Sequence, residues 1–162
     1  MNKSDPDRTY RDAMAEMIAE RWLAVWESVP VAIKGADPEG VHDVRVASRR
    51  LRAAMDVARE AFPASWYVPL LRVAKSLTAE LGEVRDRDVQ IEHLRAERAA
   101  SSPGDRVGID RLISRLEHER DAARAEMEAY LEELLHSGAK DETLRRFGGE
   151  PGRSGLESSR AG

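Results

Sequence analysis

Residues 41–52 read VHDVRVASRRLR, which places one histidine and four arginines within about three helical turns of a chain whose net charge is -4. When the segment is drawn as a helix, Arg45, Arg49 and Arg52 fall within a sector of about 60°, and Arg50 points elsewhere. The opposite side carries the apolar residues Val44, Ala47, Leu51, Met55 and Ala58. The segment therefore predicts an amphipathic helix that turns one face to a core and presents a cationic stripe on another.

The cationic stripe favours a phosphate-rich ligand, because the donors of a planar guanidinium group match the oxygens of phosphate. Two other interpretations stay open: the arginines form an ordinary solvated face, or they pair with carboxylates of neighbouring helices. From residue 41 to residue 55 the only acidic residue is Asp43, so pairs three or four residues apart leave most of the stripe without a partner. The preceding segment differs, because it mixes acids with bases as an exposed helix face does: Asp12, Glu16, Glu20, Arg11 and Arg21.

The composition indicates one helical domain. The chain has 162 residues, of which 35% are charged, 41% hydrophobic and 5% aromatic. It contains no cysteine, which excludes a disulfide framework, a thiolate metal site and a cysteine nucleophile. The N-terminal residues lack an apolar signal segment, and no apolar run approaches about 18 residues. We therefore expect a cytoplasmic protein that does not enter a membrane.

The spacing of apolar residues predicts helices over 9–28, 38–61, 66–81, 86–100, 105–136 and a short segment 142–147. We expect Pro30 to end the first helix, Asp37 to cap the second, and Gly82 to end the third. Asp86 or Asp88 is expected to cap the fourth. Short connections and the lack of any strand signal predict an all-α, antiparallel bundle of four to five helices.

Two motifs in this arrangement resemble a known family. The string HDVRVASRRLR over 42–52, followed by LGEVRDRDV over 81–89, closely resembles the paired signature of CHAD domains, the conserved histidine alpha-helical domains. The resemblance spans about 10–147, so we expect a CHAD-like domain over 9–147, a flexible segment 1–8 and a disordered tail 148–162. Family members are helical bundles that bind inorganic polyphosphate, and several are associated with polyphosphate granules. The resemblance implies the same ligand and the same location here.

Carried over motif by motif, the resemblance also implies the site residues. The implied polyphosphate-binding residues are His42, Arg45, Arg49, Arg50, Arg52 and Arg85, together with Arg72 and Lys75. Arg87 stands where the family more often has an apolar residue, so it adds a cation to the site or is merely exposed. Asp86 and Asp88 are expected to support the site, by capping a helix or by holding arginines in place.

The length of the chain is a departure from the family. Members commonly contain two related helical halves, and this chain resembles the N-terminal half of a typical member. A unit of this kind binds alone through a smaller site, or it pairs with a second copy. We expect a two-fold homodimer, because closed symmetric pairs are the common solution and the long helix 105–136 offers an apolar surface to share.

The expected function is non-catalytic binding of polyphosphate, with no catalytic residue, no cofactor and no metal site. His42 is a phosphate donor, a metal ligand or a surface imidazole, and the other histidines lie on different predicted helices. A metal-dependent phosphohydrolase is the first alternative, since Asp86 and Asp88 form a close acidic pair. Binding of an RNA or DNA backbone is another, although the stripe lacks interleaved aromatic residues, and we expect no sequence-specific nucleic-acid binding. A purely structural module is the last.

Overall fold

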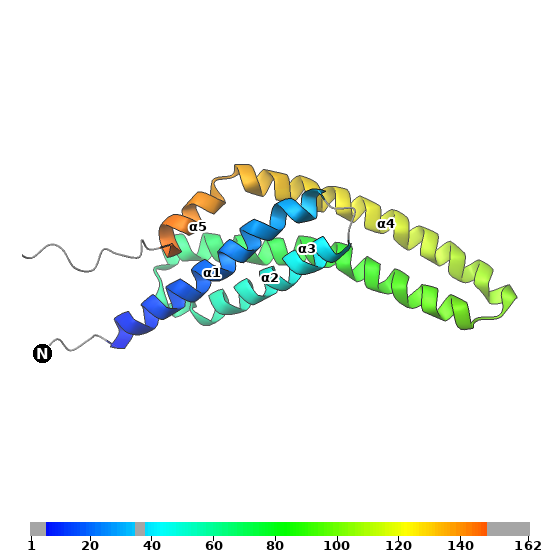
Figure 1. Cartoon of the computed structure of the whole chain (residues 1–162), viewed down its shortest axis with the longest axis horizontal. Coiled ribbons are helices and arrows are strands. Elements are labelled where there is room, and N and C mark those ends of the chain that lie inside the picture. The colour runs from blue at the N-terminus through cyan, green and yellow to red at the C-terminus, as the bar shows by residue number, and fades with distance from the viewer. Residues whose placement is uncertain (1–5, 35–37, 149–162) are drawn as a thin grey trace, which may run out of the picture.

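The computed structural model describes residues 6–34 and 38–148, and every element within these ranges is helical. The helices are α1 (Pro6–Lys34), α2 (Pro38–Val57), α3 (Ala64–Ala100), α4 (Pro103–His136) and α5 (Ala139–Phe147), with a short 3-10 turn at Arg59–Ala61. Successive long helices run antiparallel to one another (Figure 1). The prediction of an all-α helical bundle is confirmed.

The molecule has two parts that differ in shape. Helices α1 and α2 pack side by side, α2 packs on α3, α3 packs on α4, and α1 also contacts α4 and α5. Figure 1 shows that the end of α3 and the start of α4 project well beyond α1 and α2 as a two-helix hairpin. We call this projecting hairpin, residues 91–117, the arm, and the remainder of the bundle the body.

The body holds the main hydrophobic core. Its largest fully buried side chains come from all four long helices and include Trp22, Leu51, Tyr67, Leu77, Leu81 and Met127. The indole Nε1 of Trp26 donates to the hydroxyl of the buried Thr143 at 3.0 Å, which fixes α5 against α1. Burial of these apolar surfaces supplies most of the driving force for the fold.

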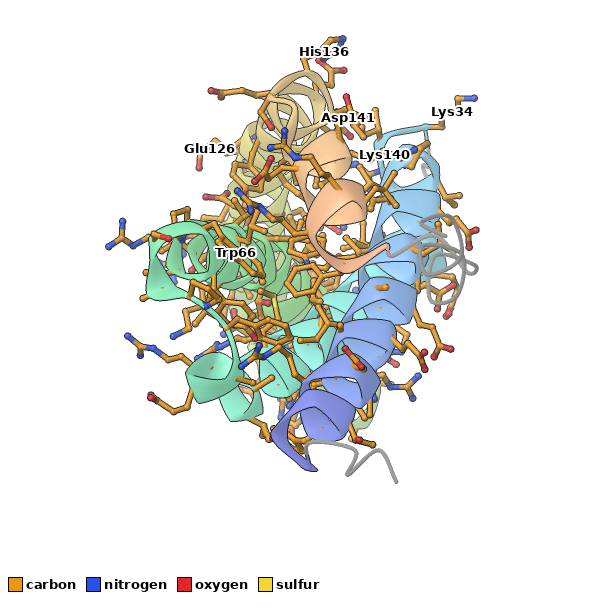
Figure 2. All side chains as sticks on the ribbon, turned by 90° about the vertical axis from the view of Figure 1, so that its left-hand side faces the viewer. Lys34, Trp66, Glu126, His136, Lys140 and Asp141 are labelled. Carbon is orange, nitrogen blue, oxygen red and sulfur yellow. The ribbon has the colours of Figure 1, made fainter. Side chains whose placement is uncertain are left out.

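Aromatic side chains close the end of the body where α5 lies. Phe62, Trp66, Tyr67 and Phe147 contact one another at ring centroid distances of 5.1 to 6.0 Å. The Tyr67 hydroxyl donates to the Met55 carbonyl at 2.7 Å, and burial raises the pKa of Tyr67. Figure 2 looks at this end of the body, with Trp66 near the start of α3 and α5 between α4 and α1.

The arm has a much thinner apolar interior than the body. Ile91 and Ile113 are its buried apolar side chains, and neither belongs to the main core cluster. Ion pairs cross between its two helices, from Arg95 to Glu117 at 2.8 Å and from Arg98 to Asp110 at 2.5 Å. The arm is therefore held by a narrow apolar contact, which half-buried Leu94, Ile109 and Leu112 extend, and exposed ion pairs of about 0–1 kcal/mol each add to it.

Two predicted helix ends are wrong. Helix α1 continues through Pro30 to Lys34, because Val29 and Ala32 stay buried in the core while Pro30 lies on the exposed side. Helix α3 continues through Gly82, because Leu81, Val84 and Ile91 extend its buried face past the glycine. A glycine inside a helix costs only about 0.5–1 kcal/mol, and the packing of those side chains outweighs it.

The unbroken α3 also corrects the capping prediction. Asp86 and Asp88 lie in the middle of α3 and cap no helix, so the third and fourth predicted helices are a single element. Two other observed boundaries lie close to the predicted ones. Helix α1 starts at Pro6 and not at residue 9, and α5 starts at Ala139 and not at residue 142. The expected cap at Asp37, the segment 1–5 and the tail from 149 lie outside the described residues.

Candidate anion-binding site

Helix α2 presents its cations as the sequence predicts. Val44, Leu51 and Met55 are buried, which fixes the rotation of the helix on the core. This rotation leaves Arg49, Arg50 and Arg52 exposed, and it leaves His42 and Arg45 half-buried at the edges of the helix. The cationic side of α2 is therefore set by the apolar residues between the arginines.

One row of cations follows the boundary between α2 and α3. An Arg45 nitrogen lies 3.9 Å from a carboxylate oxygen of Asp86. Asp56 lies 3.7 Å from Arg52 and 3.3 Å from Lys75. Arg52 thus does have a partner four residues away on its own helix, although the sequence indicated that such pairs were scarce.

Four of the implied site arginines have no partner among the described residues. Arg49 and Arg50 of α2, and Arg72 and Arg85 of α3, form no hydrogen bond or ion pair with any residue of 6–34 or 38–148. Arg49, Arg50 and Arg72 are exposed, and Arg85 is half-buried. Their guanidinium donors are free to bind an incoming anion. We call Arg45, Arg49, Arg52, Arg72, Lys75 and Arg85 the cationic surface.

Arg87 and Asp88 are placed away from the cationic surface. Arg87 forms an ion pair with Glu83 on its own helix and lies 3.9 Å from Glu119 of α4. Asp88 lies 3.8 Å from Arg120 of α4, at an exposed fraction of 17%. Both side chains belong to the contact between α3 and α4, so the structure does not bring them together with the arginines of α2.

Several buried polar atoms near α2 have no partner among the described residues. They are Nδ1 of His42, Nε of Arg45, Nε of Arg21 and Nε1 of Trp22. A buried donor without a hydrogen bond costs about 1–3 kcal/mol, and more when the group is charged. Three of these atoms belong to cationic or titratable side chains on α1 and α2.

A pocket of about 520 Å³ opens between α1 and α2. Its lining comes from two elements: Glu20, Arg21 and Ala24 of α1, and His42, Asp43, Val46, Ala47 and Arg50 of α2. His42 and Arg50 therefore face α1, whereas Arg45 and Arg52 face α3. Sequence reasoning missed Arg21, because α1 carries mixed charges and its register against α2 cannot be derived from spacing alone.

Residues 6–34 and 38–148 contain neither a candidate metal cluster nor a candidate membrane span. Nowhere in these ranges do three or more histidine, aspartate or glutamate side chains gather closely enough to hold a metal ion. None of the helices in them combines the length and the apolar character needed to cross a bilayer.

Comparisons with known proteins identify the family. A search of curated proteins finds no match, and neither does a search of solved structures. The family model of the CHAD domain matches residues 16–161. This match takes in nearly the whole chain and runs past Phe147, where the resemblance of the two motifs was expected to end. The arginine-rich helix, the α-helical bundle and the family match agree, and the chain belongs to the CHAD domain family.

Proposed function

We propose that this protein binds inorganic polyphosphate through the cationic surface, with His42 and Arg50 on the α1 side of the same helix, and that it catalyses no reaction on this ligand. The observation that carries the proposal is the set of arginines without carboxylate partners on α2 and α3, among them Arg49, Arg72 and Arg85. Polyphosphate carries about one negative charge per phosphate unit and offers no base or sugar to recognise. Binding therefore rests on charge-assisted hydrogen bonds and on the release of counterions.

The ion pairs already present on the cationic surface do not block a ligand. The Arg45–Asp86 and Arg52–Asp56 contacts are long, at 3.9 and 3.7 Å, and the two aspartates have exposed fractions of 63% and 44%. Exposed pairs of this kind contribute about 0–1 kcal/mol. A phosphate oxygen forms shorter and stronger bonds to the same guanidinium groups. The aspartates therefore orient the arginines, and a ligand displaces them from the guanidinium groups at a small cost in free energy.

A double variant with a matched control tests the proposal. We expect Arg45→Ala/Arg49→Ala to weaken binding of long-chain polyphosphate by about tenfold to a hundredfold, measured by calorimetry. The control Arg95→Ala/Arg98→Ala removes the same charge from arginines that already have carboxylate partners in the arm. Its affinity should stay close to that of the unmodified protein. Equal losses in the two variants would contradict a localised site.

The phosphohydrolase alternative gains no support from the acidic pair on α3. Asp86 lies beside Arg45 of α2 and Asp88 lies beside Arg120 of α4, so the two carboxylates face different helices. Incubation of the protein with polyphosphate and magnesium should release no phosphate, and release at a steady rate would overturn the non-catalytic proposal. For nucleic acid, excess RNA should fail to displace bound polyphosphate.

The homodimer and the location at granules remain part of the proposal. The long helix α4 buries Ile113, Met127, Leu131 and Leu134 within the same chain. Helix α1 exposes other large apolar side chains: Tyr10, Met17, Leu23 and Val31. We propose that a second copy packs there, and light scattering of the protein at increasing concentration tests this. A strictly monomeric mass, unchanged by Met17→Glu, would contradict the dimer.

A further inference from the structure

The pocket between α1 and α2 is lined by charged side chains of both signs, and these side chains form no ion pair with one another. Its cationic or donor groups are Arg21, His42 and Arg50, and its acidic groups are Glu20 and Asp43. None of these five side chains forms a hydrogen bond or ion pair with any residue of 6–34 or 38–148. Nε of Arg21 and Nδ1 of His42 are also buried. The pocket therefore presents donors and acceptors that are available to a ligand.

The two carboxylates restrict what this ligand can be. An ionised carboxylate is an acceptor only, so it repels the bare oxygens of a fully ionised anion. A ligand that suits the whole lining must offer negative oxygens to the arginines and an O–H donor to Glu20 or Asp43. Phosphate groups differ in this respect, because a terminal phosphate binds its second proton near neutral pH, whereas an interior unit of polyphosphate carries no proton.

We infer that this pocket binds a terminal, protonated phosphate group, either as orthophosphate or as the end of a polyphosphate chain. Arg21, His42 and Arg50 bind the negative oxygens, and Glu20 or Asp43 accepts the hydrogen bond from the phosphate hydroxyl. The inference rests on the proposed function for the identity of the polyphosphate ligand. It adds Arg21 and the two acids to the binding site. A volume of about 520 Å³ lies within the usual range for small-ligand pockets.

The pocket and the cationic surface then have separate roles. The cationic surface runs along the α2–α3 boundary and holds interior units, which require only positive charge. The pocket lies on the other side of α2 and selects the one part of the chain that carries a hydroxyl. Sulfate has the shape of phosphate but no proton at neutral pH, so the carboxylates exclude it.

The first experiment compares ligands on the unmodified protein. Calorimetry with orthophosphate, tripolyphosphate and sulfate at neutral pH should show phosphate binding at least about tenfold tighter than sulfate, with EDTA present throughout. In phosphorus NMR of tripolyphosphate, the end-group signal should shift or broaden more than the signal of the middle unit. Equal binding of sulfate, or binding that requires magnesium, would overturn the inference.

Variants then separate the pocket from the cationic surface. Arg21→Met should weaken orthophosphate by about tenfold to a hundredfold and change the affinity for long-chain polyphosphate far less, because the many interior units bind the cationic surface and only the chain ends use Arg21. The control Arg111→Met changes an exposed arginine of the arm and should affect neither ligand. Glu20→Gln/Asp43→Asn should raise the affinity for sulfate toward that for phosphate, since each amide adds a donor. Unchanged selectivity in this variant would contradict the role of the acids.

The two proposals fail in different ways. If long chains bind and orthophosphate does not, the pocket inference is wrong and the proposed function stands. If orthophosphate binds through Arg21 and long chains do not, the proposed function is wrong and the pocket remains a phosphate site. Circular dichroism of each variant confirms that it is folded, and Arg21→Met should melt no lower than the unmodified protein because the Arg21 guanidinium has no described partner to lose.

Discussion

Two arginines of the arm and two arginines of α2 have opposite surroundings, although both pairs lie on the outside of α-helices. In the arm, Arg95 and Arg98 lie 2.8 and 2.5 Å from the carboxylates of Glu117 and Asp110. On α2, Arg49 and Arg50 contact no carboxylate of the described residues. In the arm, ion pairs between the two helices occupy these guanidinium groups and add a small stabilisation to a thin apolar interior. Arg49 and Arg50 have no such partner, so their donors are available for a ligand.

This comparison predicts a large difference in salt dependence. If the six cations of the cationic surface each release about one counterion, polyphosphate affinity falls about a thousandfold between about 50 mM and about 200 mM salt. The ion pairs of the arm should respond far less, because each brings only two opposite charges together. Calorimetry over a salt series measures the first effect, and thermal unfolding over the same series measures the second. A flat salt dependence of binding would remove the distinction between the two regions.

Gly82→Ala tests how α3 passes from the body to the arm. The position is helical, and a Cβ built there meets no atom within 4 Å. We therefore expect alanine to stabilise the protein by about 0.5–1 kcal/mol, because glycine has the lower helix propensity. Chemical denaturation measures the gain, and polyphosphate affinity should not change. A loss of stability would show that the glycine allows a close approach that the structure does not contain.

Two neighbouring aspartates of α3 should behave differently when neutralised. Asp86→Asn removes the carboxylate beside Arg45, and we expect polyphosphate affinity to rise about twofold to fivefold, in line with the small free energy of an exposed pair. Asp88→Asn is the matched control, because Asp88 lies beside Arg120 of α4. It should leave the affinity unchanged. An equal rise in both variants would mean that net charge alone controls binding.

The smallest expected effect concerns the pH dependence of the arm. A hydrogen bond from Arg98 lowers the pKa of Asp110 below its ordinary value. This ion pair therefore stabilises the folded arm at pH values above the ordinary carboxyl pKa, and the contribution is lost as the pH falls through the lowered pKa. NMR titration of the Asp110 carboxyl should show the lowered pKa, and Arg98→Ala should return it toward the ordinary value. An unchanged pKa in the variant would contradict the pairing.

Much of this architecture could be predicted from local patterns. The apolar spacing around Leu51 predicted which side of α2 faces the core, and the two arginine-rich motifs predicted the family. The continuity of α3 could not be predicted, because it depends on side chains of other helices that pack against Leu81 and Val84. A glycine signals a helix end only when no such packing continues beyond it.

The composition of the candidate site was predictable only in part, for the same reason. Arg45 and Arg49 lie where the helical wheel places them. Arg87 faces Glu119 because of the way α3 and α4 pack. Arg21 and Arg50 line the same pocket because of the register of α1 against α2. Residues on one helix can be assigned to a face from spacing alone. Residues that converge from two helices require the packed structure.

The hydrogen bond between Trp26 and Thr143 joins positions 117 residues apart in the chain. The Trp26 ring also stacks on Trp22 at a centroid distance of 5.3 Å, so this indole contacts side chains of both α1 and α5. Tryptophan fluorescence of the protein therefore includes a signal from the docking of α5 on α1 during refolding. Because loop closure over so many residues is slow compared with helix formation, this signal should follow the appearance of helical ellipticity.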